Sequence, residues 1–116
     1  MQQNPEEPFA RITVDEAKEM IDKGGVQTVD VRQPNEYKEG HIAGTALIPL
    51  DALMKRSGEL SEDDPIIFIC GVGERSAVAC EIAAAVGREK IYNMQGGMDA
   101  WMKGFQQMTG AATKND

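Results

Sequence analysis

The stretch Ile66-Ile67-Phe68-Ile69-Cys70-Gly71-Val72-Gly73-Glu74-Arg75-Ser76 decides the fold of this chain. Its apolar start predicts a buried strand, because a strand that is covered on both faces reads as a continuous hydrophobic run. A glycine-containing turn follows, and the alanine-rich residues 75–86 then predict a helix that ends at Gly87. This order places Cys70 at the carboxyl end of the strand and near the N-terminus of the helix.

The residues around Cys70 predict a reactive thiol. Gly71 and Gly73 allow the backbone to turn tightly at little steric cost. Backbone N–H groups in such a turn and at a helix N-terminus attract anions. Arg75 and Ser76 add a cation and a hydroxyl group beside the turn. Although a cysteine at the end of an apolar strand is more often a core residue, we expect Cys70 to ionise more easily than an ordinary cysteine.

Strand and helix signals alternate along the rest of the chain. Thr13 and Glu16 form a capping-box pattern before the first helix, which Gly24 ends, and Asp51 is a candidate cap for a short helix. The alternation predicts an α/β fold, a five-stranded and mainly parallel sheet with helices on both faces. The expected strands are 10–12, 26–31, 46–48, 66–69 and 90–94, and the expected helices are 14–23, 34–39, 51–56, 75–86 and 97–104.

The length of 116 residues indicates one domain, over residues 9–108, with loose tails at 1–8 and 109–116. With 12 basic and 19 acidic residues the net charge is −7, which argues against nucleic-acid or anionic-membrane partners. No apolar stretch is long enough to span a membrane, and the N-terminus lacks the pattern of a signal peptide. One histidine, two cysteines and no CxxC argue against a metal site. We expect no cofactor, and a cytoplasmic location suits a free thiol.

Two other functions for the glycine-containing turn agree less well with the sequence. A dinucleotide-binding fingerprint that begins with Gly71 and Gly73 needs a third glycine at position 76, where this chain has Ser76. The lysine of a phosphate-binding Walker loop is also missing after this turn. A phosphatase loop of the Cys-x5-Arg type needs five residues between cysteine and arginine, whereas here residues 71–74 separate Cys70 from Arg75. Glu74 inside this shorter loop would also repel a phosphate dianion.

Three motifs together resemble the rhodanese family, in its single-domain form. They are Asp30-Val31-Arg32 with Glu36-Tyr37, Gly40-His41-Ile42, Gly44 and Ile48-Pro49; the loop from Cys70 to Ser76; and Gly96-Gly97-Met98-Asp99-Ala100-Trp101. The match runs in the right order over about residues 10–105. The combination is specific, although each motif alone is not.

The resemblance implies a sulfurtransferase in which Cys70 is the nucleophile. Its thiolate would attack the outer sulfur of thiosulfate or a persulfide, and a second thiophile, cyanide or a thiol, would remove that sulfur from the Cys70 persulfide. Residues Gly71, Val72, Gly73, Glu74, Arg75 and Ser76 would form the active-site loop, whose amides stabilise the anionic persulfide. The expected partners are a small sulfur-donor anion and a thiol acceptor, with a protein acceptor as a further option.

Several side chains leave alternatives open. Glu74 departs from the basic loops of strong thiosulfate users in this family, so we hypothesise that thiosulfate is a modest donor and that a persulfide is the physiological one. Arg75 either binds the donor or pairs with a carboxylate. We interpret Asp30, Arg32 and Glu36 as a structural ion-pair set, His41 as a turn-fixing hydrogen bonder, and Cys80 as a core residue. Trp101, Met98 and Met102 are expected in the core, and residues 59–64 in a solvated loop.

A binding or sulfur-delivery module without catalytic activity is the alternative function. Inactive members of the family usually lack the thiol, so the presence of Cys70 argues for the enzyme.

Overall fold

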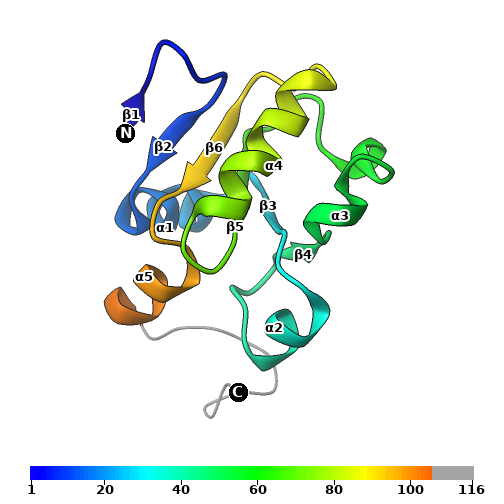
Figure 1. Ribbon diagram of the computed structural model, residues 1–116. Helices are drawn as coiled ribbons and strands as arrows, with labels where there is room; N and C mark the ends of the chain where they lie inside the picture. The colour runs from blue at the N-terminus through cyan, green and yellow to red at the C-terminus, as the bar shows by residue number, and fades with distance from the viewer. Residues whose placement is uncertain (106–116) are drawn as a thin grey trace.

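The computed structural model describes residues 1–105, which form a six-stranded sheet covered by helices (Figure 1). The strands are β1 (Gln2–Gln3), β2 (Ala10–Ile12), β3 (Gln27–Asp30), β4 (Ala46–Leu47), β5 (Ile66–Ile69) and β6 (Ile91–Met94), in the order β1-β2-β6-β5-β3-β4. β2 to β6 pair in parallel and confirm the predicted five strands. β1 is an additional edge strand, antiparallel to β2, in a segment expected to be a loose tail.

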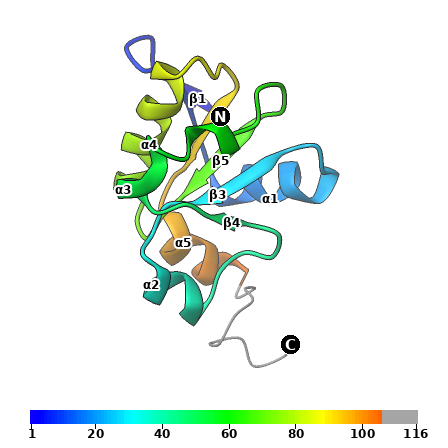
Figure 2. The same ribbon diagram turned by 90° about the vertical axis from the view of Figure 1, so that its right-hand side faces the viewer.

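The helices are α1 (Val14–Lys23), α2 (Pro34–Glu39), α3 (Leu50–Leu53), α4 (Glu74–Ala85) and α5 (Gly97–Gly104), with a short 3-10 helix at Ser57–Glu59. α1 and α5 pack on one face of the sheet, and α3 and α4 pack on the other (Figure 2). α2 lies beyond the carboxyl ends of the strands, close to α5. Within residues 1–105, none of the helices is long and apolar enough to cross a membrane.

The side chains of β5 alternate between two hydrophobic clusters. Ile66 and Phe68 pack under α3 and α4, whereas Ile67 and Ile69 pack under α1 and α5. Successive side chains of a strand point to opposite faces, so a strand between two helical layers has to be apolar at every position. The same alternation places the next residue, Cys70, in the cluster beneath α4.

The local signals at helix ends act as expected, with one exception. The Glu16 N–H donates to Thr13 Oγ1 at 3.1 Å and the Thr13 N–H donates to Glu16 Oε1 at 2.9 Å, which confirms the capping box. α3, however, runs only over Leu50–Leu53 after Pro49, so Asp51 lies inside the first turn. The predictions that Asp51 caps this helix and that the helix continues through Arg56 are both wrong. The domain limit expected at residue 108 and the tail expected at 109–116 fall outside the described residues.

Candidate active site

Cys70 follows β5 directly, and α4 begins four residues later at Glu74. The Gly73 N–H donates to Cys70 Sγ at 3.0 Å, and Gly73 itself adopts a left-handed φ of 100° that favours glycine. Ser76 Oγ lies 3.3 Å from the same sulfur. The loop therefore folds back over the sulfur, but of the amides of residues 71–75, which were all expected to point at it, only that of Gly73 donates to it. Cys70 is completely buried, with 0 % of its surface exposed.

The N-terminus of α5 holds the backbone of this loop from the other side. The Met98 N–H donates to the Cys70 carbonyl at 2.8 Å, and the Asp99 N–H donates to the Gly71 carbonyl at 3.0 Å. This contact requires a glycine at position 97, since a Cβ there would lie 2.4 Å from the Cys70 carbonyl oxygen and 2.5 Å from that of Gly71. The third motif thus positions the cysteine loop through backbone contacts.

Arg75, at the start of α4, pairs with a carboxylate. Its two terminal nitrogens donate to both oxygens of Glu36 on α2, at 2.8 and 2.9 Å. Hydrogen bonding to Arg75 lowers the pKa of Glu36 from 4.5 to about 2, and the same bonds raise the pKa of Arg75. The sequence left open whether Arg75 binds the donor or pairs with a carboxylate, and the structure shows the pairing with a carboxylate.

Asp30 and Arg32 form a second ion pair at the carboxyl end of β3, next to β5. The Arg32 side chain donates to the carboxylate of Asp30 at 2.7, 2.9 and 3.1 Å, and it also donates to the Gly40 carbonyl at 2.8 Å. Asp30 is 0 % and Arg32 7 % exposed. The ion-pair role predicted for Asp30, Arg32 and Glu36 is therefore observed. They do not form a single set, however, because Asp30 pairs with Arg32 and Glu36 pairs with Arg75.

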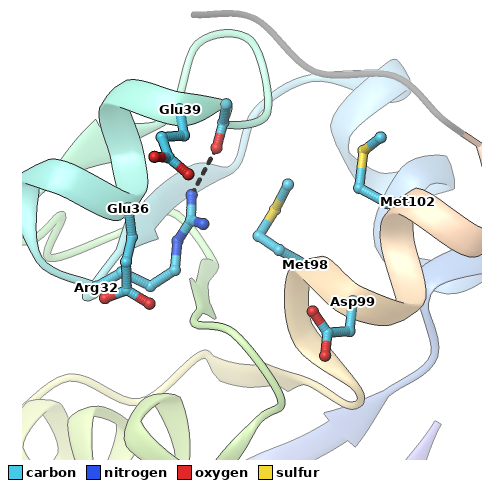
Figure 3. A pocket seen from close by; sticks show the side chains of 7 residues that line it. Arg32, Glu36, Glu39, Met98, Asp99 and Met102 are labelled. Atoms are coloured by element: carbon cyan, nitrogen blue, oxygen red, sulfur yellow. Dashed lines mark hydrogen bonds between the residues drawn. The ribbon is translucent and has the colours of Figure 1, made fainter. Parts of the chain in front are cut away.

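A pocket of about 340 Å³ lies between α2 and α5. Figure 3 shows its two sides, with the side chains of Arg32, Glu36 and Glu39 facing Met98, Asp99 and Met102 of α5; Gly40 completes the lining. The two methionines were predicted only as core residues, and both also line this pocket. The pocket adjoins the cysteine loop through the backbone bonds of residues 98 and 99, while Cys70 itself is not among the lining residues.

Other residues singled out in the sequence lie as follows. Val72 and Glu74 are exposed on the loop. His41 Nδ1 lies 2.8 Å from the Tyr37 carbonyl and its ring stacks on that of Tyr37, in agreement with the hydrogen-bonding role predicted for it. Cys80 is 0 % exposed, as predicted, and burial raises the pKa of its thiol. Residues 1–105 contain no cluster of three or more His, Cys, Asp or Glu side chains that could hold a metal.

Asn93 on β6 is a site residue that the sequence analysis missed. It is 0 % exposed, and its Oδ1 accepts a hydrogen bond of 2.5 Å from Ser76 Oγ. Its Nδ2 donates to the Gly73 carbonyl at 3.2 Å. The available signal was a polar residue inside an otherwise apolar strand.

The fold and the site together define the class of protein. A cysteine follows a central parallel strand, and the loop above it is held by the Gly96-Gly97 turn. The sequence model of the rhodanese-like domain matches residues 13–104, and the chain therefore belongs to the rhodanese family.

Individual relatives agree with this assignment. A thiosulfate sulfurtransferase, GlpE of Pseudoalteromonas translucida, is 32% identical over 99 residues, which cover 85% of this chain and 94% of that protein. An uncharacterized protein of Bacillus subtilis, YqhL, is 40% identical over 75 residues, which cover 65% of this chain but only 60% of YqhL. The crystal structure of a rhodanese-related protein from Thermoplasma volcanium superimposes with a TM-score of 0.80 at 29% identity, covering 87% of this chain and 98% of the other.

Proposed function

We propose that this protein is a sulfurtransferase that carries a sulfane sulfur on Cys70. The observation that carries the proposal is the Gly73 N–H bond to Cys70 Sγ, 3.0 Å long, at the N-terminal end of α4. A backbone donor and a helix N-terminus both stabilise negative charge on a sulfur. Similarity to GlpE, which is named a thiosulfate sulfurtransferase, supports the same reaction type.

The reaction has two steps. The Cys70 thiolate attacks the outer sulfur of thiosulfate, a new S–S bond forms, the S–S bond of thiosulfate breaks, and sulfite leaves with the electron pair. An acceptor thiolate or cyanide then attacks the outer sulfur of the Cys70 persulfide and releases the Cys70 thiolate. A persulfide donor reacts in the same way, with its thiolate as the leaving group. No side-chain general base is needed, since the attacking groups are already anions.

Access to the sulfur needs a local movement. Cys70 has no exposed surface, so the donor reaches Sγ only after part of the covering loop shifts. The exposed Val72 lies between Gly71 and Gly73 in that loop, and glycines permit backbone rotation that other residues resist. We infer that the exposed part of this loop, around Val72, shifts outward during transfer while the Gly73 N–H keeps its bond to the sulfur.

The charges near the loop favour a persulfide donor over thiosulfate. Arg75 is bonded to Glu36 and Arg32 to Asp30, so both nearby guanidinium groups have carboxylate partners. Glu74 is exposed on the loop, and two more exposed carboxylates, Glu39 and Asp99, line the adjoining pocket. A dianion such as thiosulfate is repelled more strongly than a singly charged persulfide.

The donor preference is tested by neutralising one charge. Glu74→Gln should raise kcat/KM for thiosulfate about two- to five-fold at low salt, and less at high salt, because exposed charges are screened. Glu89→Gln removes an exposed carboxylate from the segment that follows the C-terminal end of α4 and is the matched control. Equal values for wild type and Glu74→Gln contradict the electrostatic argument.

The function itself is tested by intact mass spectrometry. After brief exposure of the native protein to thiosulfate or to a low-molecular-weight persulfide, the wild type and Cys80→Ala should each gain one sulfur atom, and Cys70→Ser should gain none. Adding cyanide should remove the sulfur and release an equal amount of thiocyanate. A gain of sulfur in Cys70→Ser would show that another residue carries it.

A binding module is the second candidate, and the complete burial of Cys70 is the observation that favours it. If native protein gains no sulfur from either donor, while Cys70 reacts with iodoacetamide only in urea, the thiol is a core residue. That result would replace the sulfurtransferase by the binding module.

A further inference from the structure

A buried polar cluster lies on the α4 side of the sheet, beneath the cysteine loop. It consists of Cys70, Ser76 and Asn93, each 0 % exposed, together with the backbone of Gly73. Asn93 comes from β6 and stands opposite Phe68 of β5 in the sheet register. Buried polar groups need hydrogen-bond partners, so the protons in this cluster can be assigned one by one.

The amide of Asn93 is oriented by the loop. Only its nitrogen can donate a hydrogen bond, and Nδ2 lies 3.2 Å from the Gly73 carbonyl oxygen. Its oxygen therefore faces Ser76 Oγ, 2.5 Å away. An amide oxygen only accepts, so the single hydroxyl proton of Ser76 lies between Oγ and Asn93 Oδ1.

This assignment fixes the direction of the next contact. With its proton directed at Asn93, Ser76 Oγ presents only lone pairs to Cys70 Sγ at 3.3 Å. When Cys70 is a neutral thiol, its S–H group is then the donor and Ser76 the acceptor. With the Ser76 proton on Asn93, the Gly73 N–H is the one group among residues 1–105 that donates to the sulfur.

We propose that Asn93 is a positioning residue that controls which way the Ser76 hydroxyl points. With a neutral Cys70 thiol, Asn93 holds the hydroxyl proton away from the sulfur. When the sulfur becomes an anion, as thiolate or persulfide, the O–H group rotates about the Cβ–Oγ bond and donates to it. The inference rests on the proposed function in one respect, since the rotation has a role in sulfur transfer only if Cys70 carries sulfur.

The hydroxyl is thus shared between Asn93 and the sulfur. Removing the Asn93 oxygen should free the hydroxyl for the sulfur and favour the anion, whereas removing the hydroxyl should disfavour it. The two changes are expected to have opposite signs, although both delete a polar group from the same cluster. A cluster that served only to pack the loop would give changes of the same sign.

The kinetic test measures alkylation of Cys70 by iodoacetamide at neutral pH in a Cys80→Ala background, because only the thiolate is alkylated. Asn93→Leu should speed alkylation and Ser76→Ala should slow it, each by about tenfold or more, as for one hydrogen bond to a charged group. The double variant should match Ser76→Ala. Faster alkylation in the double variant as well would mean a merely loosened loop and would overturn the proposal, as would an unchanged rate in Asn93→Leu.

A spectroscopic test avoids altering Asn93, in case Asn93→Leu does not fold. The infrared S–H stretching band of Cys70, again in the Cys80→Ala background, should lie at the position of a hydrogen-bonded donor. It should shift to that of a free S–H group in Ser76→Ala and keep its position in the remote control Ser57→Ala. A band that does not shift in Ser76→Ala overturns the assignment.

Both measurements are independent of sulfur transfer. If the mass experiment shows no sulfur on Cys70 while the alkylation rates and the infrared band behave as expected, the sulfurtransferase proposal fails and the assignment of the Ser76 proton stands.

Discussion

Gly97→Ala should destabilise the protein and displace the cysteine loop, because this position joins α5 to the loop. Gly97 has a left-handed φ of 57°, and an added Cβ would lie 2.4 Å from the Cys70 carbonyl oxygen, 2.5 Å from the Gly71 carbonyl oxygen and 2.6 Å from the Gly71 carbonyl carbon. All three neighbours are backbone atoms. A rotamer change cannot relieve the clash, so α5 and the loop have to move apart.

The magnitude follows from two contributions. A left-handed conformation costs a residue with a Cβ roughly 1–2 kcal/mol. Separating the elements until the 2.4 Å contact exceeds 3.0 Å also stretches the bonds from the amides of Met98 and Asp99, now 2.8 and 3.0 Å long. Each such bond contributes about 0.5–1.5 kcal/mol. We expect the free energy of unfolding to fall by about 2–5 kcal/mol.

Urea denaturation followed by circular dichroism measures this loss. With an m-value of about 2 kcal/mol/M, the middle of the usual range, the midpoint should fall by roughly 1–2.5 M. Gly104→Ala is the matched control on the same helix, since its Cβ would meet only Val14 Cγ2 at an ordinary 3.8 Å, and it should be neutral or slightly stabilising. If the free energy of unfolding of Gly97→Ala lies within about 0.5 kcal/mol of the wild-type value, as for an average surface substitution, the steric reasoning is wrong.

Three further predictions concern the charged pairs and the second thiol. Glu36→Gln should lower the free energy of unfolding at neutral pH by only about 1 kcal/mol, because the ion pair of Glu36 with Arg75 is partly exposed. The pKa of Glu36 is lowered from 4.5 to about 2. The difference in stability from wild type should therefore shrink as the pH falls from 4.5 to about 2, which urea melts at a series of acid pH values measure. Asp30→Asn should cost about 3–5 kcal/mol in the same assay, because it leaves the buried Arg32 without its carboxylate, and a loss under 1 kcal/mol would contradict this. Cys80→Ala should leave the rate of sulfur loading, followed by mass spectrometry, unchanged, since the buried Cys80 stays protonated; a slower rate would assign it a role in transfer.

Most of the fold could be predicted from local signals in the sequence. The apolar residues 66–69 gave the bounds of β5, and Pro34 with Gly40 marked the two ends of α2. Such signals act through the backbone of their own segment, so no knowledge of the rest of the chain is needed. The parallel order of the strands then follows from the alternation of strands with helices.

Contacts between distant segments could not be predicted in the same way. β1 consists of Gln2 and Gln3, which have no apolar pattern and join the sheet only through backbone pairing with β2. Asn93 stands out in its strand only as a polar residue, which does not tell where it lies, and the pairing of β5 with β6 brings it beneath the loop. Cys70 could be selected from its neighbours in the sequence, whereas its complete burial depends on how α4 and α5 pack around it.

The pairing of Arg75 bears on the choice between sulfur and phosphate chemistry. A loop that binds a phosphate dianion uses its arginine as a two-pronged donor to the oxygens of the ligand. Here both terminal nitrogens of Arg75 are bonded to Glu36, a residue 39 positions away in the chain. A phosphate would have to displace a carboxylate whose pKa is lowered to about 2, which adds to the argument from loop length. A persulfide sulfur needs no such clamp, because it is held covalently and its charge can be met by the backbone of the loop.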